Sequence, residues 1–260
     1  MSVYAVNGTE PVAAWIPSLD TAGNGTTTLT DLVGSSDGTL TNMDAGSDWA
    51  ADTGAGGVRA LDFDGSNDFV AAPVGSLLSQ SQGATSLWLN SASNTDSRIV
   101  FSITSPGQEF ANALRLTWDR RSGVNGRVNF RISKNGSSLV NLDVAGEAVA
   151  SAWTHVVWTH DGTTHTFYRD GSQIGSVTSG AWLNDLSSAS VVPTHVYLAG
   201  PRTTSLDGLM DDVRVFSSGL DSDDIAYLYD SGMGRGIVAS TGAPAQNAQN
   251  NNMRNIRMSP

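Results

Sequence analysis

The chain has 260 residues, with 14 Lys and Arg against 25 Asp and Glu, a net charge of −11 and no cysteine. Disulfides and thiol chemistry are therefore excluded, and the acidic balance disfavours nucleic acid and anionic membranes as partners. A length of 260 residues allows one large all-β domain or two small ones, and 28 Gly with no long helical period favour strands and turns.

Short alternating segments recur along the chain, and most are bounded by Gly, Asn, Asp or Ser. This pattern predicts the many short strands of a β-sandwich. In RVNFRIS, apolar residues alternate with Arg127, Asn129 and Arg131, so one face of this strand is expected in the core and the other in solvent. Asn135-Gly136 then predicts a two-residue hairpin turn. The predicted strands are RALDFDG (59–65), TSLWLNS (85–91), SRIVFSI (97–103), NALRLTW (112–118), NGRVNFRISKNGSSLVNLDV (125–144), THVVWTH (154–160), THTFYRDGSQIGSV (164–177), THVYLAG (194–200) and LMDDVRVF (209–216).

The segment WTHVVWTHDGTTHTFYRDG (153–171) contains three histidines five residues apart, His155, His160 and His165. An odd spacing places His155 and His160 on opposite faces of one strand, and Asp161-Gly162 begins a turn. The segment therefore predicts strand, turn and strand rather than a helical zinc pair. A metal site stays open only because His160 and His165 flank the turn and could face each other.

One helix is predicted near the end of the chain, in LDSDDIAYLYDSG (220–232). Asp221 is its expected N-cap, Asp223 and Asp224 lie in the first turn, and Gly232 stops it. We expect this helix to cap one end of a sandwich. Residues 233–260 are of low complexity, rich in Asn and Gln, and predict an extended tail after a single domain at 1–232.

Several segments resemble, in chain order, the laminin-G-like or concanavalin A-like jelly-roll domains of bacterial and phage proteins. They are RALDFDGSNDFV, TSLWLN, WTHVVWTHDGTTHTFYRDG and LDGLMDDVRVFSSGLDSDDIAYLYDSG, and the opening strand and loop of AAWIPSLDTAGNGTTTLTDLVGSSDGTL are similar too. The resemblance covers about residues 12–232. It implies an all-β, two-sheet antiparallel jelly-roll sandwich with adjacent N- and C-terminal strands. It also implies that the Trp and His residues of 153–171 pack or hydrogen-bond rather than bind metal. Such domains serve as sugar-binding modules, adhesive spacers, virion components and glycoside hydrolases, so the fold leaves function open.

Catalysis is not expected from this chain. Glucanase relatives of the fold use two carboxylates on one strand face as nucleophile and general acid. Here Glu10, Glu109 and Glu147 are isolated from one another, and Asp62 and Asp64 match structural positions of the DFDG motif. The match of GSSDG (34–38) to a nucleophile elbow lacks the flanking strand and helix that such an elbow needs.

Structural Ca²⁺ is the candidate cofactor, because loop carboxylates and carbonyls suit a hard cation. The resemblance implies that Asp211 takes the position at which carbohydrate-active relatives hold calcium, with Asp31 or Asp37 completing the site. The alternative is that Asp211 or Asp212 hydrogen-bonds nearby backbone. The calcium loops of pentraxin-like lectins match QEFAN and GPRTTS, where Asn112 fits but an arginine replaces the carboxylates.

The candidate ligand-binding residues are Arg115, Arg127, Asn129 and Arg131, on the predicted solvent-exposed strand face. Arginine forks match the carboxylate or phosphate of an anionic glycan. The alternative is an ordinary solvent face with cross-strand Arg–Asp pairs. Four tryptophans could also stack on sugars, although aromatic residues in sandwich strands are usually core: Trp88, Trp118, Trp158 and Trp182.

We expect a non-enzymatic virion protein, a capsid decoration or a fibre or tail-attached protein that displays a lectin-like jelly roll for adhesion to a surface or glycan. This expectation joins a start without a signal-peptide pattern, a jelly roll without a catalytic pair and a basic tail that cannot fold alone. The protein would assemble in a host cytoplasm, with its tail anchored on other subunits of a homo- or hetero-oligomer. The alternative is an extracellular carbohydrate-binding module of a bacterial surface or secreted protein, and a glycoside hydrolase comes third. The expected anchoring residues are Ile237, Val238, Met253, Arg254, Ile256, Arg257 and Met258.

Overall fold

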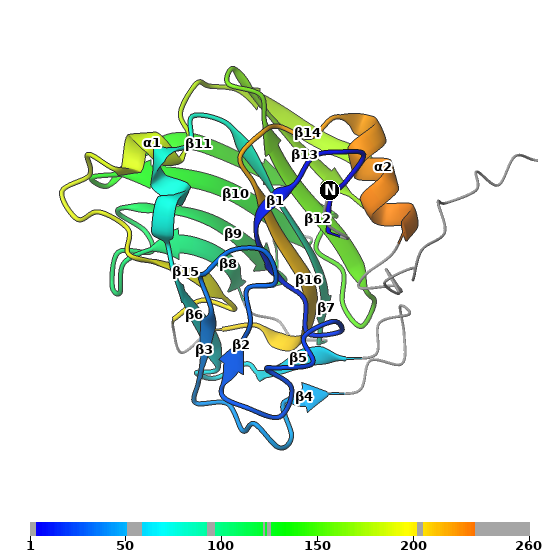
Figure 1. Cartoon of the computed structure of the whole chain (residues 1–260). Helices are drawn as coiled ribbons and strands as arrows, with labels where there is room; N and C mark the ends of the chain where they lie inside the picture. Colours follow the sequence, from blue (N-terminus) through cyan, green and yellow to red (C-terminus); the bar gives the residue numbers. More distant parts are fainter. Residues whose placement is uncertain are drawn as a thin grey trace, which may run out of the picture.

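The computed structural model describes residues 4–50, 59–92, 97–121, 123, 126–201 and 205–231. Two antiparallel sheets form a sandwich, which confirms the all-β prediction (Figure 1). No helix in these ranges is long and apolar enough to cross a membrane. The tail predicted at 233–260, with its anchoring residues from Ile237 to Met258, lies outside the described residues.

The first sheet, which we name the helix-side sheet, has the strand order β14-β13-β12-β7-β16-β5-β4, and β1 also pairs with β16. Because β1 and β16 pair antiparallel, the first long strand and the last one are adjacent, as the resemblance implied. These strands are β1 (Pro11–Trp15), β4 (Trp49–Ala50), β5 (Ala60–Asp64), β7 (Gly83–Ser91), β12 (Thr154–His160), β13 (Thr164–Arg169), β14 (Ser172–Thr178) and β16 (Asp207–Phe216).

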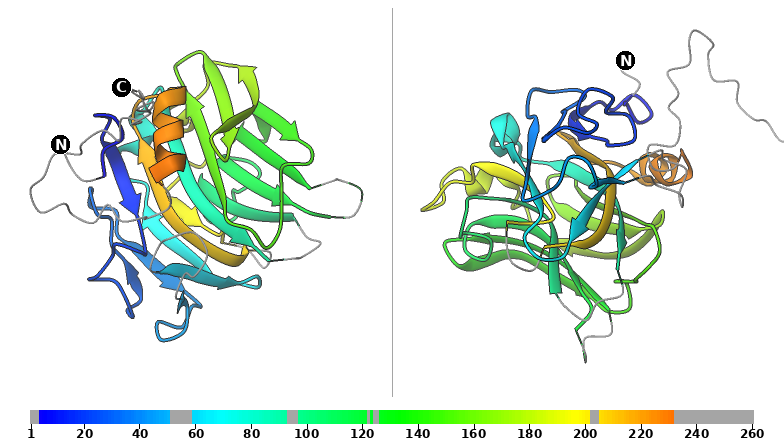
Figure 2. Two further views of the ribbon diagram at one scale, coloured as in Figure 1. Left: turned by 90° about the vertical axis from the view of Figure 1, so that its right-hand side faces the viewer. Right: turned by 90° about the horizontal axis from the view of Figure 1, so that it is seen from below.

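The second sheet, which we name the open sheet, has the order β11-β10-β9-β8-β15-β6-β3-β2. Its strands curve across the back of the sandwich in Figure 1 and are seen from two other sides in Figure 2. They are β2 (Thr28–Leu29), β3 (Gly38–Thr41), β6 (Phe69–Pro73), β8 (Ser97–Thr104), β9 (Ala113–Asp119), β10 (Arg127–Lys134), β11 (Ser137–Val144) and β15 (His195–Leu198).

The core lies between the two sheets, where alternate residues of each strand point inward. Phe130 of the open sheet contacts Phe167 and Trp158 of the helix-side sheet, with ring centroids 4.1 and 5.7 Å apart. Each such aromatic side chain contributes about 1.5–3 kcal/mol by leaving water. Of the four tryptophans considered for sugar stacking, Trp118, Trp158 and Trp182 lie in the core, which confirms the core interpretation for them. Trp88 is also buried, but on the outer face of the helix-side sheet.

The described part of the chain also has three short helices: η1 (Gly75–Ser79), α1 (Leu183–Leu186) and α2 (Ser222–Ser231). Helix α2 begins as predicted, because the Asp221 carboxylate accepts the backbone N–H groups of Asp223 and Asp224, each at 2.9 Å. Its expected position at a sandwich end was wrong. Ile225 and Leu228 pack with Ala84, Val157 and Phe216, which are apolar residues on the outer face of the helix-side sheet. Figure 2 shows α2 lying along that sheet. Helix α1 was not predicted, because four residues give no helical period.

Candidate functional site

The outer face of the open sheet carries a continuous group of polar side chains on three neighbouring strands. Antiparallel pairing aligns β10 with β9 on one side and with β11 on the other, so alternate residues of all three strands share this face. We name this group the polar patch. It consists of Arg115, Thr117 and Asp119 of β9, Arg127, Asn129 and Arg131 of β10, and Asn141 and Asp143 of β11. The four residues predicted to bind a ligand thus lie on one surface.

A tight turn fixes the register of β10 and β11. Asn135 and Gly136 have φ angles of 51° and 79°, which is the left-handed backbone that a two-residue hairpin of this type requires. The hairpin predicted from Asn-Gly is therefore confirmed. The turn is also tied to its neighbours, because the Asn135 backbone N–H donates to Asn112 at 2.7 Å and the Asn135 side chain accepts the N–H of Ser190 at 2.7 Å.

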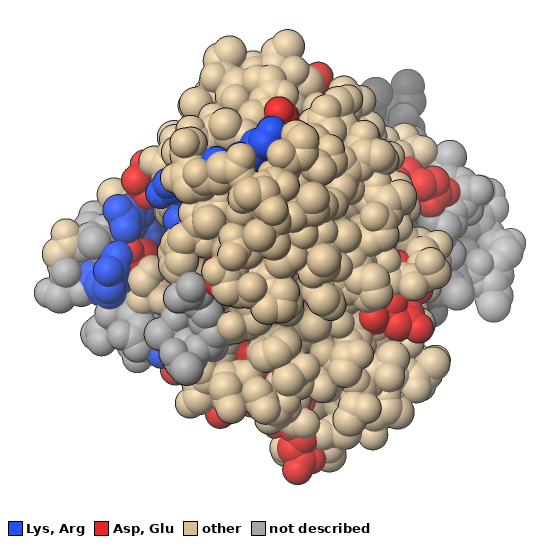
Figure 3. All heavy atoms as spheres, turned by 90° about the vertical axis from the view of Figure 1, so that its left-hand side faces the viewer, with Lys and Arg blue, Asp and Glu red and all other residues tan. Residues whose placement is uncertain are grey.

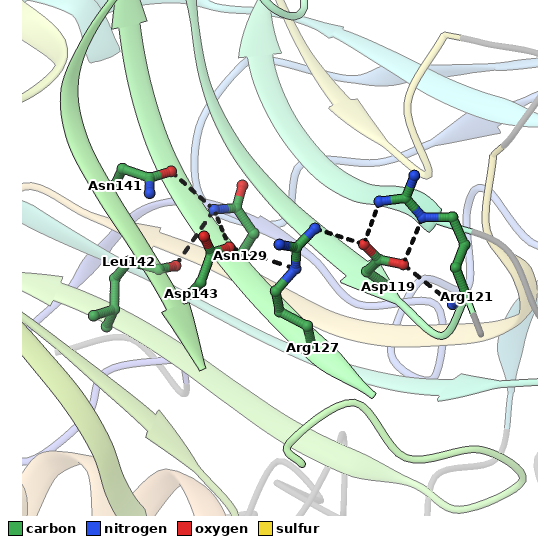
Figure 4. Close-up of polar contacts among 7 residues, drawn as sticks. All are labelled: Asp119, Arg121, Arg127, Asn129, Asn141, Leu142 and Asp143. Carbon is green, nitrogen blue, oxygen red and sulfur yellow. Dashed lines mark hydrogen bonds and ion pairs between the residues drawn. The ribbon is translucent and has the colours of Figure 1, made fainter. Parts of the chain in front are cut away.

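Asp119 organises one end of the polar patch. Its carboxylate is fully buried and accepts two hydrogen bonds from the Arg121 guanidinium, at 2.7 and 3.0 Å, and one from Arg127 at 2.8 Å (Figure 4). Burial alone would raise the pKa of Asp119, but these hydrogen bonds outweigh it and lower the pKa to about 2. Arg127 is therefore a structural residue, as the alternative of cross-strand Arg–Asp pairs anticipated.

Asn129 occupies the middle of the polar patch. Its amide nitrogen lies 3.0 Å from the Asn141 oxygen and 2.9 Å from Asp143, with the Leu142 carbonyl at 3.4 Å. These contacts point the side-chain oxygen away from all three partners (Figure 4). The orientation leaves this oxygen as an acceptor at the surface of the sheet, held by its own amide group.

Arg131 differs from the other arginines of the polar patch. Its Nε donates to the Ser133 hydroxyl at 2.9 Å, and this is its one polar contact among the described residues. It pairs across the strands with Arg115 and with Asn141, so no carboxylate lies directly opposite it. The two terminal nitrogens of Arg131 are therefore available at a half-buried position.

Arg115 lies under the loop that joins β8 to β9. One of its terminal nitrogens donates to the Glu109 carbonyl at 2.8 Å, and its guanidinium carbon is 4.3 Å from the centre of the Phe110 ring. Arg115 is only 6% exposed, whereas Phe110 is 51% exposed. Sequence analysis missed Phe110, because QEFAN was considered only as a calcium loop. The signal that could have found it is a large aromatic residue among polar turn residues.

The outer face of the helix-side sheet contains a serine–histidine pair that has no access to a substrate. Ser86 Oγ and His155 Nε2 are 2.8 Å apart, but both residues are buried, and Trp88 and Tyr229 stack with the imidazole. Burial lowers the pKa of His155 to about 3. Among the residues that the structure describes, the other imidazole nitrogen, Nδ1, has no hydrogen-bond partner, so they supply no orienting carboxylate of a catalytic triad.

His160 and His165 do face each other across β12 and β13, as neighbours in register. Their rings are stacked, with centroids 4.1 Å apart and an angle of 17°. Imidazole lone pairs lie in the ring plane, so two stacked rings cannot direct them at one ion. His165 instead accepts the Trp158 indole N–H at 3.0 Å, and His160 contacts the Ser179 carbonyl at 3.0 Å. The metal interpretation is therefore wrong, and the packing that the resemblance implied is confirmed.

Asp211 is buried at the position considered for calcium. Its carboxyl group contacts the Ser18 hydroxyl at 2.6 Å, the Ser18 backbone N–H at 3.3 Å and the Asp212 N–H at 2.8 Å. Burial, followed by the charge of Asp212, raises the pKa of Asp211 to about 8. These contacts match the alternative in which Asp211 hydrogen-bonds nearby groups.

Asp31 and Asp37 lie together but act as loop caps. The Asp31 carboxylate accepts backbone N–H groups, including those of Ala14 and Gly34 at 3.0 Å, and Asp37 accepts the N–H of Asp31 at 2.8 Å. Within the described ranges, no three His, Asp or Glu side chains are grouped so that they could hold a metal ion. As they are arranged, these carboxylate oxygens do not form a set of calcium ligands. The calcium site stays a prediction.

Comparison with known proteins gives one family and several similar folds. The model of the concanavalin A-like lectin/glucanases superfamily matches residues 64–226. No curated protein sequence matches. Domain 4 of AbnA, a GH43 extracellular arabinanase from Geobacillus stearothermophilus, in complex with arabinotriose, has a TM-score of 0.59 at 16% identity over 84% of this chain and 97% of that one.

Two further solved structures share the fold. The CBM40 of the Ruminococcus gnavus IT-sialidase, bound to α2,3-sialyllactose, has a TM-score of 0.52 at 12% identity over 64% of this chain and 94% of that one. The binding domain of botulinum neurotoxin serotype D has a TM-score of 0.60 at 13% identity over 87% of this chain, which spans 52% of that domain. At these identities the likeness is one of fold alone.

Proposed function

Because the chain belongs to the concanavalin A-like lectin/glucanases superfamily, we propose that it is a carbohydrate-binding module of a surface or secreted protein, and that the polar patch binds its glycan. The comparisons give no support to the virion role expected from the sequence. The likeness to a CBM40 bound to α2,3-sialyllactose and to an arabinanase domain in complex with arabinotriose supports the alternative instead.

The observation that carries this proposal is the difference between the two outer faces of the sandwich. Helix α2 covers the helix-side sheet over Val157 and Phe216. The polar patch on the open sheet has guanidinium and amide groups whose positions are fixed by neighbouring side chains, as Asn129 and Asp119 illustrate (Figure 4). Fixed donors and acceptors suit sugar hydroxyls, since little side-chain entropy is lost on binding.

Binding without hydrolysis is part of the proposal. Glycoside hydrolysis uses one carboxylic acid with a raised pKa and a second, ionised carboxylate. On the polar patch the buried carboxylate of Asp119 has its pKa lowered to about 2, and the guanidinium of Arg127 lies between Asp119 and Asp143. This arrangement holds the two carboxyl groups apart, and the lowered pKa of Asp119 makes it a poor proton donor.

The test is binding of the purified protein to an array of neutral and acidic oligosaccharides, followed by calorimetry with those retained. Asn129→Ala and Arg131→Ala should each weaken binding about tenfold or more, because a hydrogen bond to a charged or buried group is at stake. Tyr227→Ala, at a 43% exposed position on α2, is the matched control and should bind like the wild type. Failure to retain any oligosaccharide, or equal binding by all three variants, would refute the proposal.

A further inference from the structure

Resting on the proposed function, we infer that the glycan carries a carboxylate, that Arg131 binds this group end-on, and that Phe110 stacks on the adjoining sugar ring. The two side chains belong to different parts of the chain. Arg131 lies in the middle of β10, and Phe110 lies in the 105–112 loop between β8 and β9. What brings them to one surface is Arg115, the cross-strand neighbour of Arg131 and the residue beneath the Phe110 ring.

The loop that carries Phe110 is held from inside. Glu109 turns its side chain into the protein, where it is 1% exposed and accepts the Gly107 backbone N–H at 2.9 Å. The Asn112 side chain bonds both Gln108, at 2.9 Å, and the β10–β11 turn. Phe110 therefore remains on the outside of a braced loop, and a side chain so placed loses little freedom when a ligand packs on it.

The position of Phe110 suits a sugar ring. Half of its surface reaches solvent, while the Arg115 guanidinium lies 4.3 Å from the ring centre. Single exposed apolar side chains are common on protein surfaces, and Phe110 is distinguished by the guanidinium that lies against its ring. The axial C–H groups of a pyranose give it the flat apolar face that an aromatic ring packs against.

The contacts of Arg131 leave it a fork that suits a carboxylate. Because Nε is bonded to Ser133 at 2.9 Å, the side fork of the guanidinium is occupied. The two terminal nitrogens that remain form the end-on fork, whose spacing matches the two oxygens of a carboxylate. Arg131 lies directly opposite Arg115 on the neighbouring strand, and the Arg115 guanidinium contacts the Phe110 ring.

The charge around this end of the polar patch favours the same ligand. Although the chain carries a net charge of −11, Arg115 and Arg131 are direct cross-strand neighbours on the polar patch. Lys and Arg side chains gather in one region of the molecule when it is seen from the left-hand side of Figure 1 (Figure 3). A locally positive surface on an acidic protein attracts an anionic group.

The experiment measures affinities of the full chain for matched pairs of ligands: 3′-sialyllactose against lactose, and trigalacturonate against its methyl ester. At least one acidic member should bind about tenfold or more tightly than its neutral partner, and Arg131→Gln should remove that preference. Phe110→Ala should weaken acidic and neutral members alike by about tenfold, and Phe110→Tyr should restore binding because it keeps the ring. Circular dichroism and melting confirm that each variant is folded.

The outcomes separate this inference from the proposed function. If neutral sugars bind as tightly as acidic ones, or if Arg131→Gln and Phe110→Ala bind like the wild type while Asn129→Ala does not, the inference is overturned and the glycan-binding function stands. Tight binding of a sulfated oligosaccharide in place of both carboxylates also overturns it. If no sugar of either kind binds, the proposed function itself fails.

Discussion

Asp211 is expected to be protonated at neutral pH, and its hydrogen-bond geometry gives the reason. The Ser18 hydroxyl oxygen lies 2.7 Å from the Arg59 carbonyl and 2.6 Å from Asp211 Oδ2. A hydroxyl has one proton, so it cannot donate to both oxygens. The two contacts are both hydrogen bonds if Ser18 donates to the carbonyl and Asp211 donates its own proton to Ser18. Burial, with Asp212 adding to it, raises the pKa of Asp211 to about 8, in agreement with this arrangement.

The sign of the pH dependence follows from the raised pKa. An aspartate in the unfolded chain has a pKa of 3.8, against about 8 here, so the folded state binds the proton more tightly. The stability from this group is complete below the unfolded value and is lost as pH rises through about 8. Linkage gives a loss of about 2–3 kcal/mol between about pH 6 and about pH 9.

The variant Asp211→Asn isolates this effect, because its amide nitrogen can donate to Ser18 as the protonated carboxyl does. Guanidinium unfolding of both proteins in EDTA measures the free energy of unfolding at each pH. At about pH 6 the variant should be the more stable protein by about 3 kcal/mol, because the unfolded wild-type carboxyl is ionised there and must take up a proton on folding. Between about pH 6 and about pH 9 the wild type should lose about 2–3 kcal/mol more than the variant, since the other titrating groups cancel.

Two results would refute the reasoning about Asp211. An equal pH dependence in wild type and Asp211→Asn would mean that the carboxyl group does not hold a proton in the folded state. Stabilisation of the wild type, but not of Asp211→Asn, by calcium would mean that the group is an ionised ligand, as the sequence resemblance implied.

Three further outcomes are expected. Asp119→Asn should lower the free energy of unfolding by about 1–3 kcal/mol, because two arginines lose their buried partner, whereas exposed Asp143→Asn should change it by less than about 1 kcal/mol in the same denaturant titration. Burial lowers the pKa of His155 to about 3, so the contribution of its neutral imidazole to the free energy of unfolding is complete above about pH 6.5 and is lost as pH decreases. We expect a loss of about 2 kcal/mol at about pH 5, and a smaller pH dependence of the free energy of unfolding in His155→Gln. Laminarin, lichenan, agarose and carrageenan should yield no reducing ends, and turnover abolished by Asp62→Asn would contradict the non-enzymatic proposal.

The alternation of side chains along β10 was readable from the sequence, and the function of each side chain was not. A period of two places Arg127, Asn129 and Arg131 on one face whatever their neighbours are. Their partners depend on which strand pairs with β10 and in which register. Arg127 lies opposite Asp119 and is bound to it, whereas Arg131 lies opposite another arginine. A shift of four residues along β9 would place Asp119 opposite Arg131 instead of Arg127, without any change in the pattern of β10.

Phe110 was not predicted, because its exposure depends on the burial of the neighbouring residue, Glu109. Glutamate side chains are mostly exposed and phenylalanine side chains mostly buried. In the 105–112 loop the order is reversed, with Glu109 inside and Phe110 outside. Glu109 is held inside because its carboxylate accepts the backbone N–H of Gly107, and its backbone carbonyl accepts a hydrogen bond from Arg115 of β9. Local sequence carries no period from which such a contact could be inferred.

The sequence did, however, contain a sign of which sheet would be left open. The strand THVVWTH (β12) is apolar at Val156 and at Val157, on both of its faces, and this indicates burial on both sides. Val157 lies on the outer face of this sheet and packs under α2, so the helix removes this apolar side chain from water. The strand RVNFRIS (β10) is apolar on one face only. The proposed ligand-binding surface lies where the alternation is strict, because the outward side chains of β10 are polar and can bind a partner.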